Sequence, residues 1–437
     1  MKKKISLLLG VIFIPVLFVN AQRIDLAKSW IQKLASPELH GRGYVNRGDS
    51  IAAAFLQSKF KEFGLESFTP GYLQHYTMSV NTFPNTMELK INDKRITPGF
   101  GYVIQSNSFS YTGKLNIVEI SQKKLRKKNI EKQLEIENPE NTILLCRSYD
   151  FPKNKKKAEQ IKANITRLRT ENLFKTKGLI IVNENRLMWG VSANRKTTDY
   201  LVFNVNKDSL PENPQVADVD FKSMKINNYE SQNVIGYVKG KEVPDSFIVL
   251  TAHYDHLGRM GSEAIFPGAN DNASGTSMLL DLARYYASDS AKPRCSMVFM
   301  LFSGEEAGLL GSQFNADHPL FALQKTKLLI NLDMVGTGSS GITVVNGEKF
   351  PQVWEVFNRI NTEKKYLKLV AKRGEACNSD HCPFYQKGVT SIFIYAMGSE
   401  FTEYHNAWDQ AERLPLTKYS EIFKLVREVA DEYQKAR

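Results

Sequence analysis

Residues 247–258 read FIVLTAHYDHLG, an apolar run that ends in two histidines and an aspartate. The first part, Phe247–Thr251, predicts a buried strand, because a short continuous apolar run suits a strand that is covered on both faces. Similar runs occur at Met297–Phe302, Leu328–Leu332 and Ser391–Tyr395. Acidic residues follow two of these three runs closely, at Glu305–Glu306 and Asp333.

Helical patterns alternate with these runs. They cover Arg23–Ala35, Ser50–Phe63, Gly275–Tyr286 and Tyr419–Tyr433. Strands alternating with helices predict an α/β fold, in which helices flank a mostly parallel mixed sheet. Ligands of such sheets bind where strands end at their carboxyl edge, so polar residues after each strand are candidate site residues.

The middle of the chain has a different texture. Short β-like runs alternate there with lysine-rich connectors, at Leu115–Ile120, Thr142–Leu145, Leu179–Val182 and Leu201–Val205. We therefore expect a β-rich domain, residues 93–228, inserted between two parts of a catalytic domain, residues 22–92 and 229–437. Two structural units also suit a length of 437 residues.

Residues 1–21 form a candidate signal peptide. A basic start at Lys2–Lys4 precedes the apolar run Ile5–Val19, and small residues end at Ala21 before Gln22. This pattern predicts cleavage between Ala21 and Gln22 and a secreted or periplasmic protein, with a retained membrane anchor as the alternative. No later apolar run is long enough to span a bilayer, so we expect no membrane span in the mature chain.

The formal net charge of +12 belongs mostly to the inserted segment, since residues 93–228 contain 25 basic and 15 acidic residues. Its basic runs, Lys123–Lys128 and Lys153–Lys157, contain no aromatic residues on which bases could stack. A solvated basic face is therefore favoured, and we expect no nucleic-acid partner.

The histidines and carboxylates near strand ends are of the types that hold divalent metals. His253 and Asp255 are two residues apart, so both side chains can point the same way in extended backbone. His253 is a candidate ligand, and Asp255 is a candidate to fix its other ring nitrogen. Asp271 lies in the tight turn GANDNASG, where a carboxylate can bridge two cations with its two oxygens.

The remaining candidates follow later strands. Glu305 and Glu306 are adjacent, so that one can bind a metal while the other stays free as a base. Asp333 directly follows its strand, and His405 lies in the loop YHNAWD after the last strand. Each of these short segments alone has an ordinary structural explanation, whereas the five segments together indicate a metal site.

The motifs AHYDHLG, GANDNASGT, FSGEEAGLLGS and NLDMVG resemble those of the dinuclear-zinc exopeptidases of metallopeptidase family 28. Bacterial leucyl aminopeptidases and plasma glutamate carboxypeptidase belong to that family. The resemblance implies two zinc ions. One set of ligands is His253, Asp271 and Asp333, and the other is Asp271, Glu306 and His405. It also implies that Glu305 is the general base and that the inserted domain is of the protease-associated type.

The resemblance predicts hydrolysis of terminal peptide bonds by a metal-bridged water that Glu305 activates. Peptides are the expected substrates and aminopeptidase action the expected mode, while carboxypeptidase action stays open. The alternatives are a glutaminyl cyclase-like enzyme of the same fold, which uses one zinc, and a non-catalytic receptor-like binding protein. Metals other than zinc, such as manganese or cobalt, also suit imidazole and carboxylate ligands.

His381 competes with His405 for the place of the last ligand. The family has its ligand in a loop of the His405 type, so we expect His381 to support the pocket. Cys377 and Cys382 are close enough to pair, but relatives with a nearby disulfide have both cysteines before the Ser-Asp-His triplet. The pairing therefore stays open, whereas Cys146 and Cys295 are expected to be buried thiols.

Overall fold

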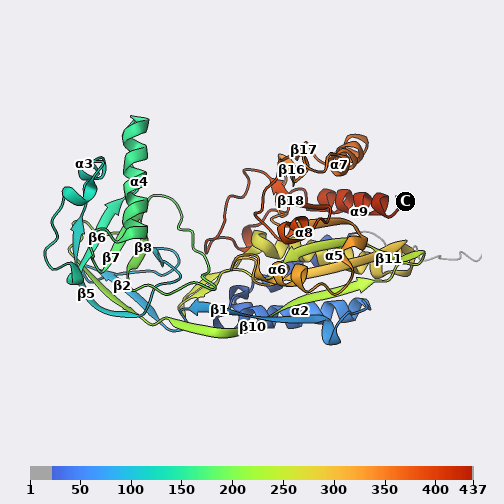
Figure 1. Ribbon diagram of the computed structural model, residues 1–437, viewed down its shortest axis with the longest axis horizontal. Helices are drawn as coiled ribbons and strands as arrows, with labels where there is room; N and C mark the ends of the chain where they lie inside the picture. Colours follow the sequence, from blue (N-terminus) through green and yellow to red (C-terminus); the bar gives the residue numbers. More distant parts are fainter. Residues whose placement is uncertain (1–21, 436–437) are drawn as a thin grey trace, which may run out of the picture.

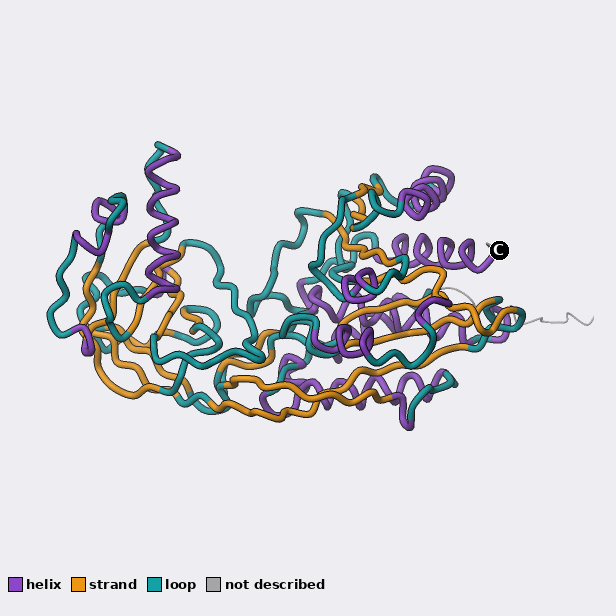
Figure 2. The backbone as a smooth tube through the Cα atoms, in the orientation of Figure 1, coloured by secondary structure: helices purple, strands orange, loops and turns teal. Residues whose placement is uncertain are grey.

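The computed structural model describes residues 22–435, so the signal peptide predicted for residues 1–21 lies outside the described part. Figures 1 and 2 show two parts side by side, with strands β1 (Leu73–Thr82) and β10 (Met224–Val238) running from one toward the other. In residues 22–435, no helix combines the length and the apolar character needed to cross a membrane.

The larger part is built on a mixed eight-stranded sheet. In spatial order its strands are β1, β10, β14 (Cys295–Phe302), β11 (Val243–His253), β15 (Thr326–Leu332), β18 (Ser391–Met397), β16 (Gly341–Val345) and β17 (Val370–Lys372). The four central strands β14, β11, β15 and β18 are parallel, and the next strand on each side, β10 or β16, pairs with them in the antiparallel direction. This confirms the predicted α/β fold with a mixed sheet.

Both faces of this sheet are buried at its centre, which explains the continuous apolar runs in the central strands. In β14, Met297, Phe299 and Leu301 join the core on one face, while Val298 and Met300 join the core on the other. The first face is covered by α1 (Ile24–Leu34), α2 (Gly48–Phe63), α5 (Gly275–Ala287), α7 (Pro351–Lys364) and α9 (Tyr419–Lys435). The second is covered by α6 (Leu310–Asp317) and α8 (His381–Gln386). A small hairpin, β12 (Gly258–Met260) and β13 (Ala264–Phe266), follows β11.

The smaller part is a second eight-stranded sheet, formed between β1 and β10 of the chain. In spatial order its strands are β3 (Lys94–Ile96), β2 (Met87–Ile91), β9 (Val216–Phe221), β5 (Tyr111–Glu119), β6 (Thr142–Arg147), β7 (Gly178–Asn183), β8 (Leu201–Asn206) and β4 (Tyr102–Ile104). The proposed domain limits and the protease-associated type stay predictions.

One lysine-rich segment expected to be a connector is a helix, α4 (Lys155–Glu171). Ile161, Ile165 and Leu168 lie on one side of it and pack on the second sheet, where a short helix, α3 (Gln122–Leu125), also packs. The side chain of Asn154 caps its start by accepting a hydrogen bond from the Lys157 N–H. The apolar spacing was present in the sequence, but the surrounding lysines obscured it.

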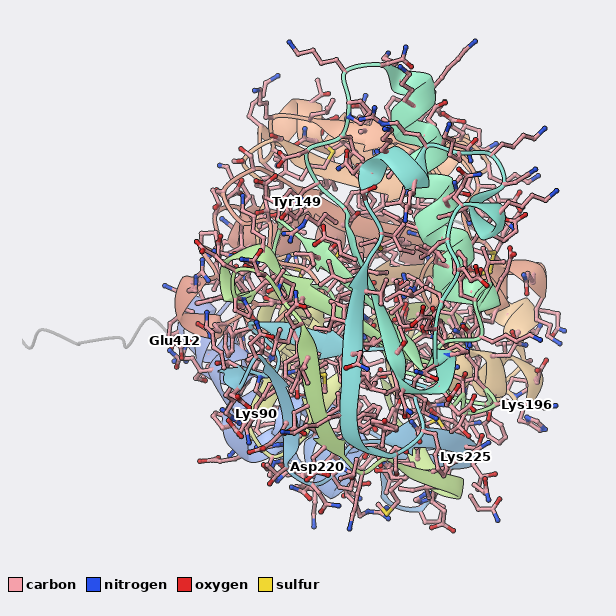
Figure 3. The ribbon with its side chains drawn as sticks, turned by 90° about the vertical axis from the view of Figure 1, so that its left-hand side faces the viewer. Lys90, Tyr149, Lys196, Asp220, Lys225 and Glu412 are labelled. Atoms are coloured by element: carbon pink, nitrogen blue, oxygen red, sulfur yellow. A yellow bond between two sulfur atoms is a disulfide. The ribbon has the colours of Figure 1, made fainter. Side chains whose placement is uncertain are left out.

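Figure 3 faces the smaller part and shows its charged surface. Lys196 and Lys225 are exposed near its margin, and the acidic Asp220 is exposed as well. Charges of both signs are thus interspersed over a surface that is basic on balance.

Arg42 is fully buried between the amino-terminal helices and the loop that follows β11. Its guanidinium donates hydrogen bonds to five backbone carbonyls, those of Leu34, Tyr254, Pro267, Gly268 and Asp271. Burial lowers its pKa to about 10, so that the group stays charged at neutral pH. A single side chain thereby ties together the end of α1, the loop after β11 and the turn that precedes α5.

Replacing this guanidinium should destabilise the protein strongly. Arg42→Met leaves several buried carbonyl oxygens without a donor, each costing about 1–3 kcal/mol. We expect a loss of at least about 3 kcal/mol in urea denaturation. Arg47→Met is the matched control, because Arg47 is exposed, and it should change stability by less than about 1 kcal/mol. Equal unfolding midpoints for the two variants would contradict this role of Arg42.

Candidate metal centre

Three parallel strands bring their carboxyl ends to one edge of the larger sheet. His253 is the last residue of β11, and Asp333 directly follows β15. Glu305 and Glu306 lie in the loop after β14. Because β14 and β15 both pair with β11 in parallel, these four side chains emerge side by side.

Two loops complete the cluster. Asp271 lies in the turn Ala269–Ser274 that leads into α5, and His405 lies in the loop before α9. The carboxylate of Asp409 joins the two loops, since it accepts hydrogen bonds from the N–H groups of Asn270 and Asp271 at 2.8 and 3.0 Å.

The side chains form two donor groups that share one carboxylate. Nε2 of His253 lies 3.4 Å from Oδ1 of Asp271 and 3.3 Å from Oδ1 of Asp333. Nε2 of His405 lies 3.2 Å from Oδ2 of Asp271 and 3.0 Å from Oε2 of Glu306. Asp271 thus directs one oxygen into each group, and all five residues predicted as ligands lie together.

The donor atoms suit divalent cations. Nε2 of His253 and Oδ1 of Asp333 are both buried, face each other and have no hydrogen-bond partner. Buried polar atoms normally have hydrogen-bond partners, so these two unpaired atoms fit a site for a metal ion that binds imidazole nitrogen and carboxylate oxygen. Zinc takes that combination.

The electrostatics of the cluster favour positive charge. Burial alone would lower the pKa of His405, but Glu306 and Asp271 more than offset it and raise the pKa to about 11. For Asp271, burial alone would raise the pKa, but hydrogen bonds from His253 and His405 hold this pKa well below its usual value. The carboxylate of Asp271 is therefore stabilised in its charged form by the groups around it.

Glu305 differs from its neighbour Glu306. Burial, aided by the negative charges of Asp380, Glu306 and Asp333, raises the pKa of Glu305 well above its usual value. A carboxylate with a raised pKa is better matched to proton transfer near neutral pH. Glu305 also lines a cavity of about 300 Å³ together with Asp271, Asp333 and His405.

Asp255 connects His253 to the loop of Glu305. Its Oδ1 accepts a hydrogen bond from the Glu305 N–H at 3.2 Å, and Oδ2 accepts one from the Tyr44 hydroxyl at 3.4 Å. Nδ1 of His253 lies 3.2 Å from the Asp255 backbone carbonyl and 3.7 Å from its carboxylate. The carbonyl is thus the nearer acceptor for the imidazole, while the carboxylate mainly fixes the Glu305 loop.

Several supporting residues were not assigned a role from the sequence. Nδ1 of His256 is 2.7 Å from Oε1 of Glu306. The Ser379 hydroxyl donates to Oδ2 of Asp333 at 2.8 Å. Asp409 follows His405 in the loop YHNAWD, so its nearness to a candidate ligand was the available signal. Arg42 gave no such signal, because nothing in the sequence distinguishes a buried loop arginine from an exposed one.

His381 lies in a supporting position. Its Nε2 donates a hydrogen bond to the Ala376 carbonyl at 2.8 Å, and its ring packs against Phe393. Burial lowers its pKa to about 4.

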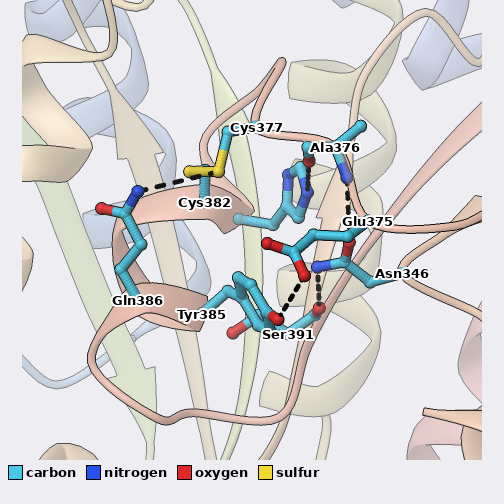
Figure 4. The surroundings of a disulfide bond; sticks show 9 residues. Asn346, Glu375, Ala376, Cys377, Cys382, Tyr385, Gln386 and Ser391 are labelled. Carbon is cyan, nitrogen blue, oxygen red and sulfur yellow. Dashed lines mark hydrogen bonds between the residues drawn. A yellow bond between two sulfur atoms is a disulfide. The ribbon is translucent and has the colours of Figure 1, made fainter. Parts of the chain in front are cut away.

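The open question of the cysteines is settled, because Cys377 and Cys382 form a disulfide (Figure 4). This bond joins the loop before α8 to the first turn of that helix. Cys146 and Cys295 are buried free thiols, as predicted.

The smaller part of the protein touches the loop of His405. The backbone N–H of Trp189 donates a hydrogen bond to the His405 carbonyl at 2.9 Å. Arg186 pairs with the carboxylate of Glu403 and lies 5.1 Å from the ring centroid of Trp408. His405 has a φ of 51°, a backbone conformation that surrounding contacts must maintain.

Known proteins resemble this chain in sequence. Aminopeptidase YwaD of Bacillus subtilis is 32% identical over 238 residues, which cover 52% of this chain and 50% of that protein. A probable leucine aminopeptidase of Arthroderma otae is 28% identical over 258 residues, covering 53% of this chain and 71% of that protein. The chain thus spans about half the length of the first of these curated relatives.

Solved structures share the fold. A zinc aminopeptidase from Bacillus subtilis has a TM-score of 0.66 at 23% identity, covering 95% of this chain and 97% of that one. A peptidase M28 precursor from Shewanella amazonensis has a TM-score of 0.69 at 16% identity, covering 94% of both chains. In addition, residues 233–430 match the family model of peptidase family M28. These residues hold every candidate ligand, so the match to peptidase family M28 covers the whole candidate metal centre.

Proposed function

We propose that this chain is an exported zinc-dependent exopeptidase, acting as an aminopeptidase on peptides. The observation that carries the proposal is the position of Glu305, a partly buried carboxylate that lines a cavity together with members of two metal-donor groups. The names of the similar proteins, aminopeptidase and zinc aminopeptidase, support the same activity.

The proposed site holds two zinc ions. His253, Asp271 and Asp333 would hold one, and Asp271, Glu306 and His405 the other. The shared Asp271, with one oxygen in each donor group, supports a count of two. Zinc held in this way supplies Lewis acidity toward water and a carbonyl oxygen.

The protein's own groups have distinct tasks in peptide hydrolysis. Glu305 takes the proton of the attacking water and delivers it to the amine that leaves when the C–N bond breaks. Asp255 holds the Glu305 backbone and so sets the position of that carboxylate. His256 and Ser379 hold Glu306 and Asp333 in orientation, as hydrogen-bond partners of ligating carboxylates do.

The end of the peptide that is attacked can be tested directly. An aminopeptidase hydrolyses leucyl-p-nitroanilide and rejects amino-blocked dipeptides, whereas a carboxypeptidase does the reverse. Zinc-dependent release of nitroaniline, abolished by a chelator and restored by zinc, is the expected result.

Export can be tested by sequencing the amino terminus of the mature protein, which should begin at Gln22.

The two histidines should differ in their effect on metal content. His405→Ala removes a ligand, so zinc measured in the purified protein should fall from about two ions per chain to about one. His381→Ala removes only a group that donates to the Ala376 carbonyl, so its zinc content should stay near two. A loss of zinc in His381→Ala with retention in His405→Ala would reverse the assignment. One zinc in the unaltered protein would favour the cyclase-like alternative.

The two adjacent glutamates should separate chemistry from metal binding. Glu305→Gln removes the base but no ligand, so zinc should remain while kcat falls by ~10²–10⁴-fold. Glu306→Gln replaces an anionic ligand by a neutral one, so zinc should be lost from one position and excess zinc should partly restore activity. Metal content and kcat measured on both variants decide the matter. Zinc loss in Glu305→Gln alone would mean that the roles are exchanged.

A further inference from the structure

The cavity beside Glu305 is large enough for one side chain or the end of a short peptide, at about 300 Å³. Apart from the proposed metal and base residues, it is lined by Met334, Arg373, Asn378, Phe393, Tyr395 and Tyr404. Under the proposed function, a substrate group next to the reacting bond must enter this cavity.

The walls of the cavity are mainly aromatic. Phe393 and Tyr395 are two residues apart on β18, so they face the same side of the strand, and their ring centroids are 5.5 Å apart. Tyr404 stacks on the imidazole of His405 with centroids 3.9 Å apart. Such walls suit the aliphatic part of a substrate residue but provide no positive charge.

Arg373 provides the positive charge. Its backbone is fixed on both sides, because its N–H donates to the Val344 carbonyl at 3.0 Å and its carbonyl accepts from the Glu348 N–H at 3.2 Å. The loop that follows is closed by the disulfide Cys377–Cys382, which limits its movement. The position of Arg373 at the cavity is thus set by the fold.

The guanidinium of Arg373 is available to a ligand. It forms no hydrogen bond or ion pair with any residue in the range 22–435, although arginines elsewhere in that range commonly pair with carboxylates. The cavity carboxylates Asp271, Glu305 and Asp333 therefore lie beyond the 4.0 Å limit of an ion pair with it. A planar guanidinium matches a carboxylate with two parallel hydrogen bonds.

We propose that Arg373 determines specificity by pairing with a carboxylate of the substrate. This inference rests on the proposed peptidase function and adds the substrate class, peptides with an acidic group near the reacting bond. The carboxylate can come from two sources. One is the side chain of a terminal glutamate or aspartate, and the other is the free α-carboxylate of a dipeptide.

Two matched substrate pairs distinguish the sources. Glutamyl- and glutaminyl-p-nitroanilide differ only in the side-chain carboxylate, and leucyl-glycine and leucyl-glycinamide differ only in the terminal one. We expect the unaltered enzyme to prefer the carboxylate-bearing member of one pair by about tenfold in kcat/KM. In Arg373→Met that preference should fall to about one. The ratio within a pair cancels any general loss of activity.

Lys368→Met is the matched control, because Lys368 is an exposed cation in the segment before β17 and does not line the cavity. It should keep the preference of the unaltered enzyme. Absence of a preference in both pairs, or its persistence in Arg373→Met, would overturn the role of Arg373. Failure of the unaltered, zinc-loaded enzyme on leucyl-p-nitroanilide as well would instead overturn the proposed function.

Discussion

The shared carboxylate of Asp271 is the constraint on which the rest of the structure depends. It directs one oxygen toward His253 and the other toward His405, two residues that are 152 positions apart in the chain. Because the carboxylate is small and rigid, the positions of its two oxygens fix where the two histidines must lie. The turn of Asp271, the end of β11 and the loop of His405 must therefore keep fixed relative positions.

Buried hydrogen bonds from Arg42 and to Asp409 maintain those positions. Arg42 donates to carbonyls on both sides of the turn and on the loop after β11, and Asp409 accepts from the turn itself. Both act on backbone groups of loops, where no strand or helix satisfies them. A metal centre assembled from loops at a sheet edge needs this kind of support, because imprecise ligands cannot hold a cation in a fixed geometry.

The sequence was sufficient for the parts of the fold and site that depend on local pattern. Continuous apolar runs identify β11, β14, β15 and β18. The five predicted ligands lie together because these strands are parallel, so that they and the loops after them end at one edge of the sheet. The specific metal roles of these residues stay predictions. Family resemblance, and not spacing, pointed to His405 over His381.

Other features could not be predicted because they depend on contacts distant in sequence. The burial of Arg42 arises from loops more than 200 residues away, and no local pattern marks it. The edge strands β1 and β17 and the strand β16 beside β17 were missed because they are short or alternate with polar residues. The order of Cys377 and Cys382 around the Ser-Asp-His triplet argued against a pairing that the loop geometry permits.

The inserted part is more than an appendage to the catalytic sheet. Through Trp189 and Arg186 it contacts the loop that carries His405, and through β1 and β10 it is continuous with the larger sheet. The left-handed backbone of His405 stores conformational free energy that these contacts must offset. A ligand of the proposed centre is therefore held partly by residues that lie outside the segment matched to family M28. The smaller part therefore contributes directly to the surroundings of the candidate metal centre, through its contacts with the loop of His405.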